Sequence, residues 1–308
     1  MKPFLSPNQV KGLLGRVLGP MRIFLGSERD LTVFVSHNTP QRALTQFERT
    51  LDALAGDYTF LSPTELNDYF AKPHKFTCGP YALLTFDDGF ANNYAAAEVL
   101  AARRIPSVFF LATGFISSKN PIDFYQSNIL RGNRPNHLRN DPHPEFQSLA
   151  PSQVGEIAAM GHEVASHTVS HPFLWTLPDA VIATEILEDR RALEALVGYP
   201  VTGFCLPFGD GGHRCRLIRV ARSCGVRYIR DTQGRNGFGP PEDPYCWPVA
   251  AHCSEDIETF WEDFLSCSRP DRIFYLWGHS YEFDERNEWE RIERFLAASG
   301  SHPDLWKA

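Results

Sequence analysis

The chain has 308 residues, of which 43% are hydrophobic and 22% are charged, so it can bury a large core and is not intrinsically disordered. Thirty basic residues against 37 acidic ones leave a net charge of −7, without any block of lysine or arginine. This balance repels a phosphate backbone, so we do not expect nucleic acid as a partner.

Residues 1–30 are predicted to form an N-terminal amphipathic helical segment. Its apolar residues recur at the spacing of one helix face, at Val10, Leu13, Leu14, Val17 and Leu18. Such a helix either packs on the main domain or makes peripheral contact with a membrane surface. The sequence contains no run of 18 apolar residues, so we predict no transmembrane helix.

The compartment is expected to be the cytoplasm. Basic residues interrupt the apolar run that a secretory signal needs, at Lys11, Arg16 and Arg22. The seven cysteines are scattered, without a C-x-x-C pair, which is typical of reduced thiols rather than of a disulfide framework.

From residue 31 onward, strand-like and helix-like patterns alternate. The strand-like runs are Leu31–Val35, Tyr81–Phe86, Ser107–Leu111, Glu163–Ala165, Thr202–Leu206, Val226–Ile229, Trp247–Val249 and Arg272–Trp277. Helical patterns cover Leu44–Leu54, Tyr94–Arg103, Pro178–Leu196 and Leu217–Cys224. This alternation predicts an α/β fold, a parallel sheet with outer helices that closes toward a (β/α) barrel, as one domain over residues 31–308. The segment Ser117–Ser152 is too long for a simple connector, so we expect it to cover a functional site.

Two adjacent carboxylates end one of the apolar strands, in Thr85-Phe86-Asp87-Asp88-Gly89. Side-by-side carboxylates repel each other, so a positive group must lie nearby if both are ionised, and a divalent cation would serve. Aspartate and glycine are also common at ordinary strand-to-turn boundaries, so this motif alone does not decide between the two interpretations.

Two histidines follow a later strand, in Ser166-His167-Thr168-Val169-Ser170-His171-Pro172. One helical turn would place the rings of His167 and His171 on the same face, the arrangement by which paired histidines chelate zinc. Pro172 stops a helix from extending far, so we expect the pair in a loop-like turn after the strand. Together with Asp87 or Asp88 they form a two-histidine, one-carboxylate set that leaves coordination positions open, which is typical of a catalytic metal. The other carboxylate is then free to act as a general base.

In chain order, the motifs T-F-D-D-G, S-H-T-x-x-H-P, F-x-x-P-F-G and a histidine after a late strand resemble those of the polysaccharide deacetylases, carbohydrate esterase family 4, with the NodB homology domain. The resemblance runs from about Leu31 to about Phe283. It implies a distorted (β/α) barrel, and a divalent metal held by Asp88, His167 and His171. Zinc is the expected metal, although Co²⁺, Ni²⁺ or Fe²⁺ would suit the same ligand atoms.

The same resemblance implies roles for several other residues. Asp87 would be the general base and His279 the general acid. Pro207 and Phe208 match the third motif, in which the N–H of the aromatic residue helps to bind the oxyanion. Leu276 and Trp277 would shape the acetyl pocket. We add Asp231 as a group that orients His279, and His37, at the end of the first strand, as a substrate contact.

The third motif departs from the family pattern. Many members carry there an arginine that contacts the base, whereas this chain has Phe204-Cys205-Leu206. Without that cation the ionised form of Asp87 lacks a partner, or another group must take its place. We treat Arg230, which precedes Asp231, as structural.

The predicted activity is hydrolysis of the N-acetyl group of an amino sugar or sugar conjugate. Trp247, Trp277 and Tyr281 are candidates for the flat surface on which a sugar ring stacks. Deformylation or opening of a cyclic amide is the alternative within the same chemistry. Two other classes remain open: a non-catalytic sugar-binding relative, because of Cys205, and a non-haem iron oxygenase, which uses the same ligand set.

Overall fold

A computed structural model describes residues 31–37, 39, 44–72, 75–76, 79–131, 146–231, 238–239, 243, 246–247, 251–269, 272–278, 288, 290–291 and 294–295. The predicted N-terminal segment, residues 1–30, lies outside this part of the chain, as does His279. Among the described residues, no helix has the length and apolar character needed to cross a bilayer.

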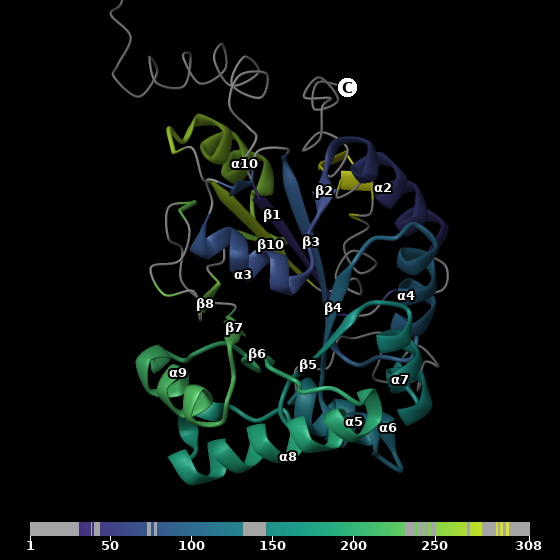
Figure 1. The fold of residues 1–308 in the computed structure, drawn as a ribbon, viewed down its shortest axis with the longest axis vertical. Helices are drawn as coiled ribbons and strands as arrows, with labels where there is room; N and C mark the ends of the chain where they lie inside the picture. The colour runs from purple at the N-terminus through teal and green to yellow at the C-terminus, as the bar shows by residue number, and fades with distance from the viewer. Residues whose placement is uncertain are drawn as a thin grey trace, which may run out of the picture.

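One parallel sheet organises the described residues (Figure 1). Its strands are β1 (Leu31–Ser36), β2 (Thr59–Phe60), β3 (Tyr81–Asp88), β4 (Ser107–Leu111), β5 (Glu163–Ser166), β6 (Gly203–Cys205), β7 (Tyr228–Arg230), β8 (Cys246–Trp247), β9 (Ala251–His252) and β10 (Ile273–Trp277). They follow the order β8-β7-β6-β5-β4-β3-β1-β10-β9, and β2 pairs with the first residues of β3. The two ends of this order, β8 and β9, do not pair with each other in the described residues, so the sheet is an open, distorted barrel.

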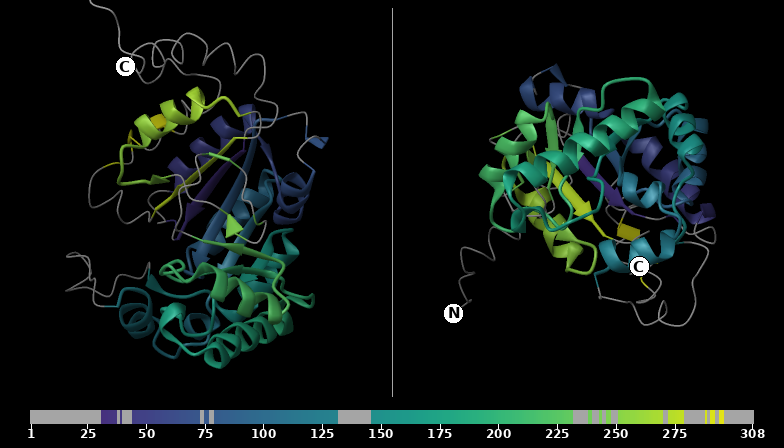
Figure 2. Two further views of the ribbon diagram at one scale, coloured as in Figure 1. Left: turned by 90° about the vertical axis from the view of Figure 1, so that its left-hand side faces the viewer. Right: turned by 90° about the horizontal axis from the view of Figure 1, so that it is seen from below.

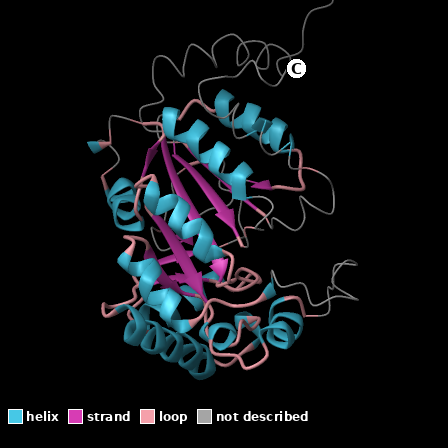
Figure 3. Cartoon of the chain, turned by 90° about the vertical axis from the view of Figure 1, so that its right-hand side faces the viewer, coloured by secondary structure: helices cyan, strands magenta, loops and turns pink. Residues whose placement is uncertain are grey.

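Helices lie around the outside of the sheet (Figures 2 and 3). They are α2 (Leu44–Asp57), α3 (Pro63–Ala71), α4 (Asn93–Ala102), α5 (Thr113–Ile116), α6 (Pro121–Phe124), η3 (Tyr125–Ile129), α7 (Pro151–Ala159), η6 (Leu174–Thr176), α8 (Asp179–Val197), α9 (Arg214–Ser223) and α10 (Ile257–Ser266). The predicted α/β fold with outer helices is therefore confirmed.

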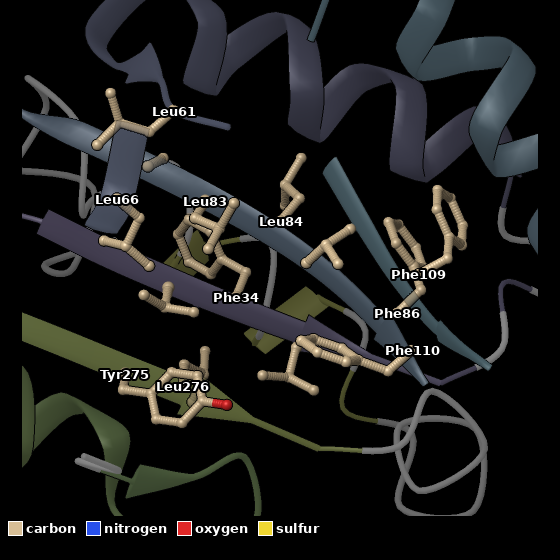
Figure 4. Close-up of a cluster of buried hydrophobic side chains, with 14 of the residues drawn as sticks. Phe34, Leu61, Leu66, Leu83, Leu84, Phe86, Phe109, Phe110, Tyr275 and Leu276 are labelled. Carbon is tan, nitrogen blue, oxygen red and sulfur yellow. The ribbon is translucent and has the colours of Figure 1, made fainter. Parts of the chain in front are cut away.

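The central strands are buried because their sequences are almost wholly apolar, as expected of parallel strands that are covered on both faces. Every residue of β3 and β4 is buried. Figure 4 shows this core, in which the rings of Phe86 and Phe109 stack with centroids 4.7 Å apart. A rigid central sheet of this kind fixes the positions of the residues at its carboxyl edge.

Two sequence interpretations need correction. Trp247 is 1% exposed and stacks on Tyr228 with ring centroids 5.0 Å apart, so it belongs to the core and offers no surface to a sugar. The long segment after α5 is partly helical, because α6 and η3 lie within it. It does reach the predicted site, since Asn128 Nδ2 donates to the carbonyl of Ser170 at 2.8 Å.

Candidate active site

The carboxyl ends of adjacent strands bring the predicted site residues together. In the sheet register Asp88 pairs with Leu111, Leu111 with Ser166, and Ser166 with Phe204. The residue that follows each strand end therefore lies at one level of the same edge, where parallel sheets place their sites.

Asp88, His167 and His171 form a buried cluster. Asp88 Oδ1 lies 3.4 Å from Nε2 of each histidine, and the two ring centroids are 4.8 Å apart. The three residues are between 1% and 4% exposed. Backbone geometry helps to aim the carboxylate, because Asp88 has a φ of 70°, a conformation that aspartate tolerates better than most residues, before Gly89 at 97°.

The histidine pair lies in a loop after β5, as Pro172 indicates, and not on a helical turn. Residues 167–171 form an irregular loop between β5 and η6. Thr168 has a φ of 70° and His171 a φ of 50°, so left-handed backbone turns, rather than one helical turn, bring the two rings together. The predicted proximity of the histidines and their loop-like setting after the strand agree with the structure, whereas the helical turn considered for their spacing does not form.

A hydrogen bond fixes the ring of His167. Its Nδ1 lies 3.0 Å from the carbonyl oxygen of Cys205, so Nδ1 carries a proton and Nε2 faces Asp88. Metal-bound histidines commonly use such a partner to set their tautomer and orientation. Cys205 therefore contributes to the site through its backbone.

The electrostatics of the cluster suit a cation. Burial alone would raise the pKa of Asp88, but the attraction of the nearby His167 and His171 rings outweighs it and places the pKa well below its usual value. Burial lowers the pKa of His171, which favours the neutral ring that a metal requires. Burial also opposes charge on His167, but Cys205 and Asp88 outweigh this and raise the pKa of His167, so a metal must displace a proton there.

The residues present fit a divalent metal. Asp88 Oδ1 is buried, has no hydrogen-bond partner and faces two imidazole nitrogens, a donor set that zinc and similar ions accept. A second group, Asp87, His167 and Cys205, also has ligand atoms within 4.8 Å of one another. A guanidinium already contacts both Asp87 and Cys205 there, so a fixed positive charge opposes a metal at that position.

This guanidinium belongs to Arg230, the residue that the sequence interpretation treated as structural. Arg230 is 0% exposed, and its Nη2 forms an ion pair with Asp87 Oδ2 and lies 2.8 Å from Cys205 Sγ. Its Nη1 donates to Thr85 Oγ1 at 3.1 Å. The cation that the third motif lacks is thus supplied to Asp87 by the neighbouring strand.

Strand register explains why Arg230 can take this place. Cys205 of β6 and Arg230 of β7 are direct partners in the sheet, so an arginine on β7 reaches the same space as one at position 205. The sequence signal that could have indicated this role of Arg230 is an arginine at the end of a short, otherwise apolar strand. Its partner could not be identified without the register.

His37 lies beside the predicted base. Its Nε2 is 3.6 Å from Asp87 Oδ2, and its Nδ1 is 3.0 Å from the carbonyl oxygen of Gly278. The side chain is 12% exposed, so its ring can be reached from solvent.

The two residues predicted to shape the acetyl pocket lie at the end of β10. Leu276 is 6% exposed and Trp277 is half-buried. The Trp277 ring packs edge-on against the His252 ring, with centroids 4.3 Å apart.

The third motif follows β6 at the same edge. Pro207 is buried, and Phe208 has a φ of 59° with its ring edge-on to His171 at 4.6 Å. The Phe208 N–H makes no hydrogen bond to another residue in the described part of the chain. The residue proposed to bind an oxyanion is therefore adjacent to a predicted metal ligand.

Asp231 is fully buried at the end of β7, where its Oδ2 lies 3.2 Å from Nη2 of Arg214. Arg214 also pairs with Asp210 at 2.9 Å. His279 lies outside the described residues, so its role as general acid and its orientation by Asp231 remain predictions.

Comparison with known proteins finds relatives that match part of this chain. Chitooligosaccharide deacetylase from Sinorhizobium fredii (strain NBRC 101917 / NGR234) is 26% identical over 123 residues, which cover 39% of this chain and 43% of that protein. The protein of the same name from Rhizobium leguminosarum bv. trifolii is 30% identical over 113 residues, which cover 36% of this chain and 38% of that protein. The chain spans less than half the length of these relatives.

Solved structures share the fold. IcaB from Ammonifex degensii aligns with a TM-score of 0.58 and 21% identity, over 78% of this chain and 98% of that one. A de-N-acetylase from Aggregatibacter actinomycetemcomitans aligns with a TM-score of 0.54 and 16% identity, over 75% of this chain and 99% of that one. At these identities the likeness shows the fold alone, and it confirms the expected deacetylase-type barrel.

The sequence profile of one family, described as polysaccharide deacetylase, matches residues 74–229, just over half of the chain. The matched region contains Asp87, Asp88, His167, His171 and Phe208, and it ends one residue before Arg230. The family resemblance seen in the motifs is confirmed: this chain belongs to the polysaccharide deacetylase family.

Proposed function

We propose that the protein is a metal-dependent amide hydrolase that removes the acetyl group from an N-acetylated amino sugar or sugar conjugate. The observation that carries this proposal is the buried trio of Asp88, His167 and His171 beside a second carboxylate, Asp87, that has its own cation. Open coordination positions next to an independent base are what metal-assisted hydrolysis requires.

Each residue has a chemical task in this reaction. A divalent metal bound to Asp88, His167 and His171 would lower the pKa of water and polarise the acyl carbonyl. Asp87, paired with Arg230, accepts the proton from the attacking water. The Phe208 N–H donates to the developing oxyanion, a contact of about 3–4 kcal/mol for a well-placed donor. His279 donates a proton to the departing amine, and acetate and a free amino sugar leave.

Zinc is the metal that we propose for this site. The ligand set of two imidazoles and one carboxylate matches catalytic zinc centres, and the Cys205 carbonyl sets the tautomer of His167 as such centres require. The same donors accept cobalt, nickel or iron. Metal analysis of purified protein, with Asp88→Asn as the ligand-deficient control, identifies the resident ion.

The substrate that we infer is a soluble or membrane-linked sugar intermediate rather than a cell-wall polymer. The inference rests on the expected cytoplasmic location, on the reduced state expected of the cysteines, and on the amphipathic pattern of residues 1–30. A nucleotide-linked or lipid-linked N-acetylated sugar satisfies all three. Peripheral contact of the N-terminal segment with a membrane would favour the lipid-linked form.

A substrate panel tests the activity and its substrate class together. Acetate and formate release are measured on free, nucleotide-linked and lipid-linked N-acylated sugars, with zinc-loaded wild type, Asp87→Asn and the matched surface variant Glu188→Gln. We expect acetate release by wild type and Glu188→Gln, and its loss in Asp87→Asn. Formate release alone would identify a deformylase, and no release by zinc-loaded wild type would contradict the proposal.

A further inference from the structure

The loop that carries both histidines has an unfavourable backbone. We define the ligand loop as Ser166–His171, which includes two non-glycine residues in the left-handed region, Thr168 at 70° and His171 at 50°. Threonine is β-branched, so this conformation is particularly unfavourable for it. Such residues persist only where the surrounding structure over-determines them, and they concentrate at functional sites.

Asp189 of α8 holds the first end of the ligand loop. Its Oδ2 accepts hydrogen bonds from Ser166 Oγ at 2.6 Å and from the His167 N–H at 3.2 Å. Its Oδ1 accepts from the Thr113 N–H at 2.8 Å, at the start of α5. The carboxylate is 0% exposed, so one buried group joins the ends of β4 and β5 to α8.

Glu185 holds the other end of the ligand loop. Its two oxygens accept from the Ser170 N–H at 2.8 Å and from Ser170 Oγ at 2.7 Å. Glu185 and Asp189 are four residues apart on α8, so their side chains lie one helical turn apart on the same face. Rigid helix geometry therefore fixes the distance between the two points at which the loop is held.

The middle of the ligand loop is held by a close backbone contact. The Gly114 N–H donates to the Val169 carbonyl at 2.9 Å. A Cβ at position 114 would lie closer than 3.0 Å to that carbonyl oxygen, so only glycine allows this approach. Within the loop, the His171 N–H donates to Thr168 Oγ1 at 3.0 Å, which ties the two left-handed residues together.

We propose that Glu185 and Asp189 are positioning residues, which hold the ligand loop in its metal-binding geometry before the metal arrives. This inference rests on the proposed metal site at Asp88, His167 and His171. Metal ions are bound more tightly when the ligands are already in place, because less conformational freedom is lost on binding. Neither carboxylate touches a ligand atom of the metal set, so both act through the loop.

A general role in holding α8 is the alternative explanation, and the structure separates the two. Apolar side chains on α8 already anchor the helix, because Ile182, Ile186 and Leu193 are each 0% exposed. Removing the half-buried Glu185 carboxylate should therefore leave the helix docked while the loop loses two hydrogen bonds. A role limited to docking α8 would change the melting temperature and leave metal affinity unaltered.

The test compares Glu185→Gln, Glu185→Ala and Asp189→Asn with the wild type and with Glu188→Gln, an exposed position on the same helix. Cobalt and zinc dissociation constants are measured by competition with a chromophoric chelator. Amide hydrogen exchange of Ser170 and His167 is measured in the metal-free protein, and melting temperatures report on folding. Glu185→Gln retains one acceptor and Asp189→Asn retains the side-chain volume, so both variants should fold.

We expect Glu185→Ala and Asp189→Asn to bind metal roughly 10- to 100-fold more weakly, the usual effect of losing a partner that orients a ligand, with Glu185→Gln between them and wild type. The Ser170 amide should exchange faster in Glu185→Ala, whereas Glu188→Gln should match wild type in every measurement. Unchanged exchange with metal affinity within about twofold of wild type would overturn the proposal. Because exchange is measured without metal, it tests the positioning role even if the protein releases no acetate.

Discussion

Replacing Arg230 by methionine would leave Asp87 as a buried carboxylate without its cation. Arg230 is 0% and Asp87 2% exposed, so water cannot take over the lost contact. Breaking such a buried pair from one side costs about 3–5 kcal/mol of unfolding free energy.

Urea denaturation of wild type and Arg230→Met at pH 7 measures this loss of unfolding free energy. Asp87→Asn combined with Arg230→Met completes a double-mutant cycle, and the double variant should be more stable than the sum of the single losses predicts.

Acetate release gives the functional side of the Arg230 test. Arg230→Met should lose most turnover while retaining metal, because Arg230 contacts the base and none of the three ligands. Moving the cation back, in Cys205→Arg with Arg230→Leu, should recover part of the activity, since positions 205 and 230 are direct partners across the sheet. An Arg230→Met variant with unfolding free energy within about 0.5 kcal/mol of wild type at pH 7 and normal turnover would refute the reasoning.

Three further changes have defined outcomes. Gly114→Ala should destabilise the fold by about 1–3 kcal/mol in thermal melts and weaken metal binding in chelator competition, whereas Gly56→Ala, where a Cβ meets nothing within 4 Å, should do neither. Burial lowers the pKa of His162 from 6.5, so the unfolded state binds the proton more readily than the folded state does. The stability of the wild type should therefore fall as the pH drops below 6.5. In thermal melts across this pH range, His162→Gln should show a weaker fall. Without metal, Asp88→Asn should melt within a few degrees of the metal-free wild type. Thermal melts with added zinc should raise the melting temperature of the wild type and not that of Asp88→Asn.

The parts of the site that the sequence predicts are those that depend on neighbouring residues along the chain. Asp87 and Asp88 end an apolar strand, and His167 and His171 follow another, so sheet geometry alone places them at one edge. Arg230 could not be assigned in this way, because its relation to Asp87 depends on the pairing of β6 with β7. The left-handed turns at Thr168 and His171 were equally hidden, since threonine disfavours this conformation and histidine adopts it only in a small minority of cases.

The missed elements have different physical reasons. Strands β2 and β9 have two residues each, too few for an alternating pattern to appear. Helix α3 did carry a signal: Ser62 and Glu65 form a capping box, and Pro63 occupies the first helical turn. Helix α10 likewise has an N-cap residue, Asp256, whose side chain accepts from the Thr259 N–H. These two helices could have been predicted from their first turns.

A zinc titration of metal-free protein tests the central claim most directly, with acetate release from an N-acetylated sugar as the measured quantity. The proposed mechanism predicts that activity rises until about one equivalent of zinc is bound and then stays constant. Asp87→Asn should bind the same equivalent without activity, because it lacks only the base. Acetate release that is indifferent to zinc removal, or near-normal turnover by Asp87→Asn, would contradict the claim.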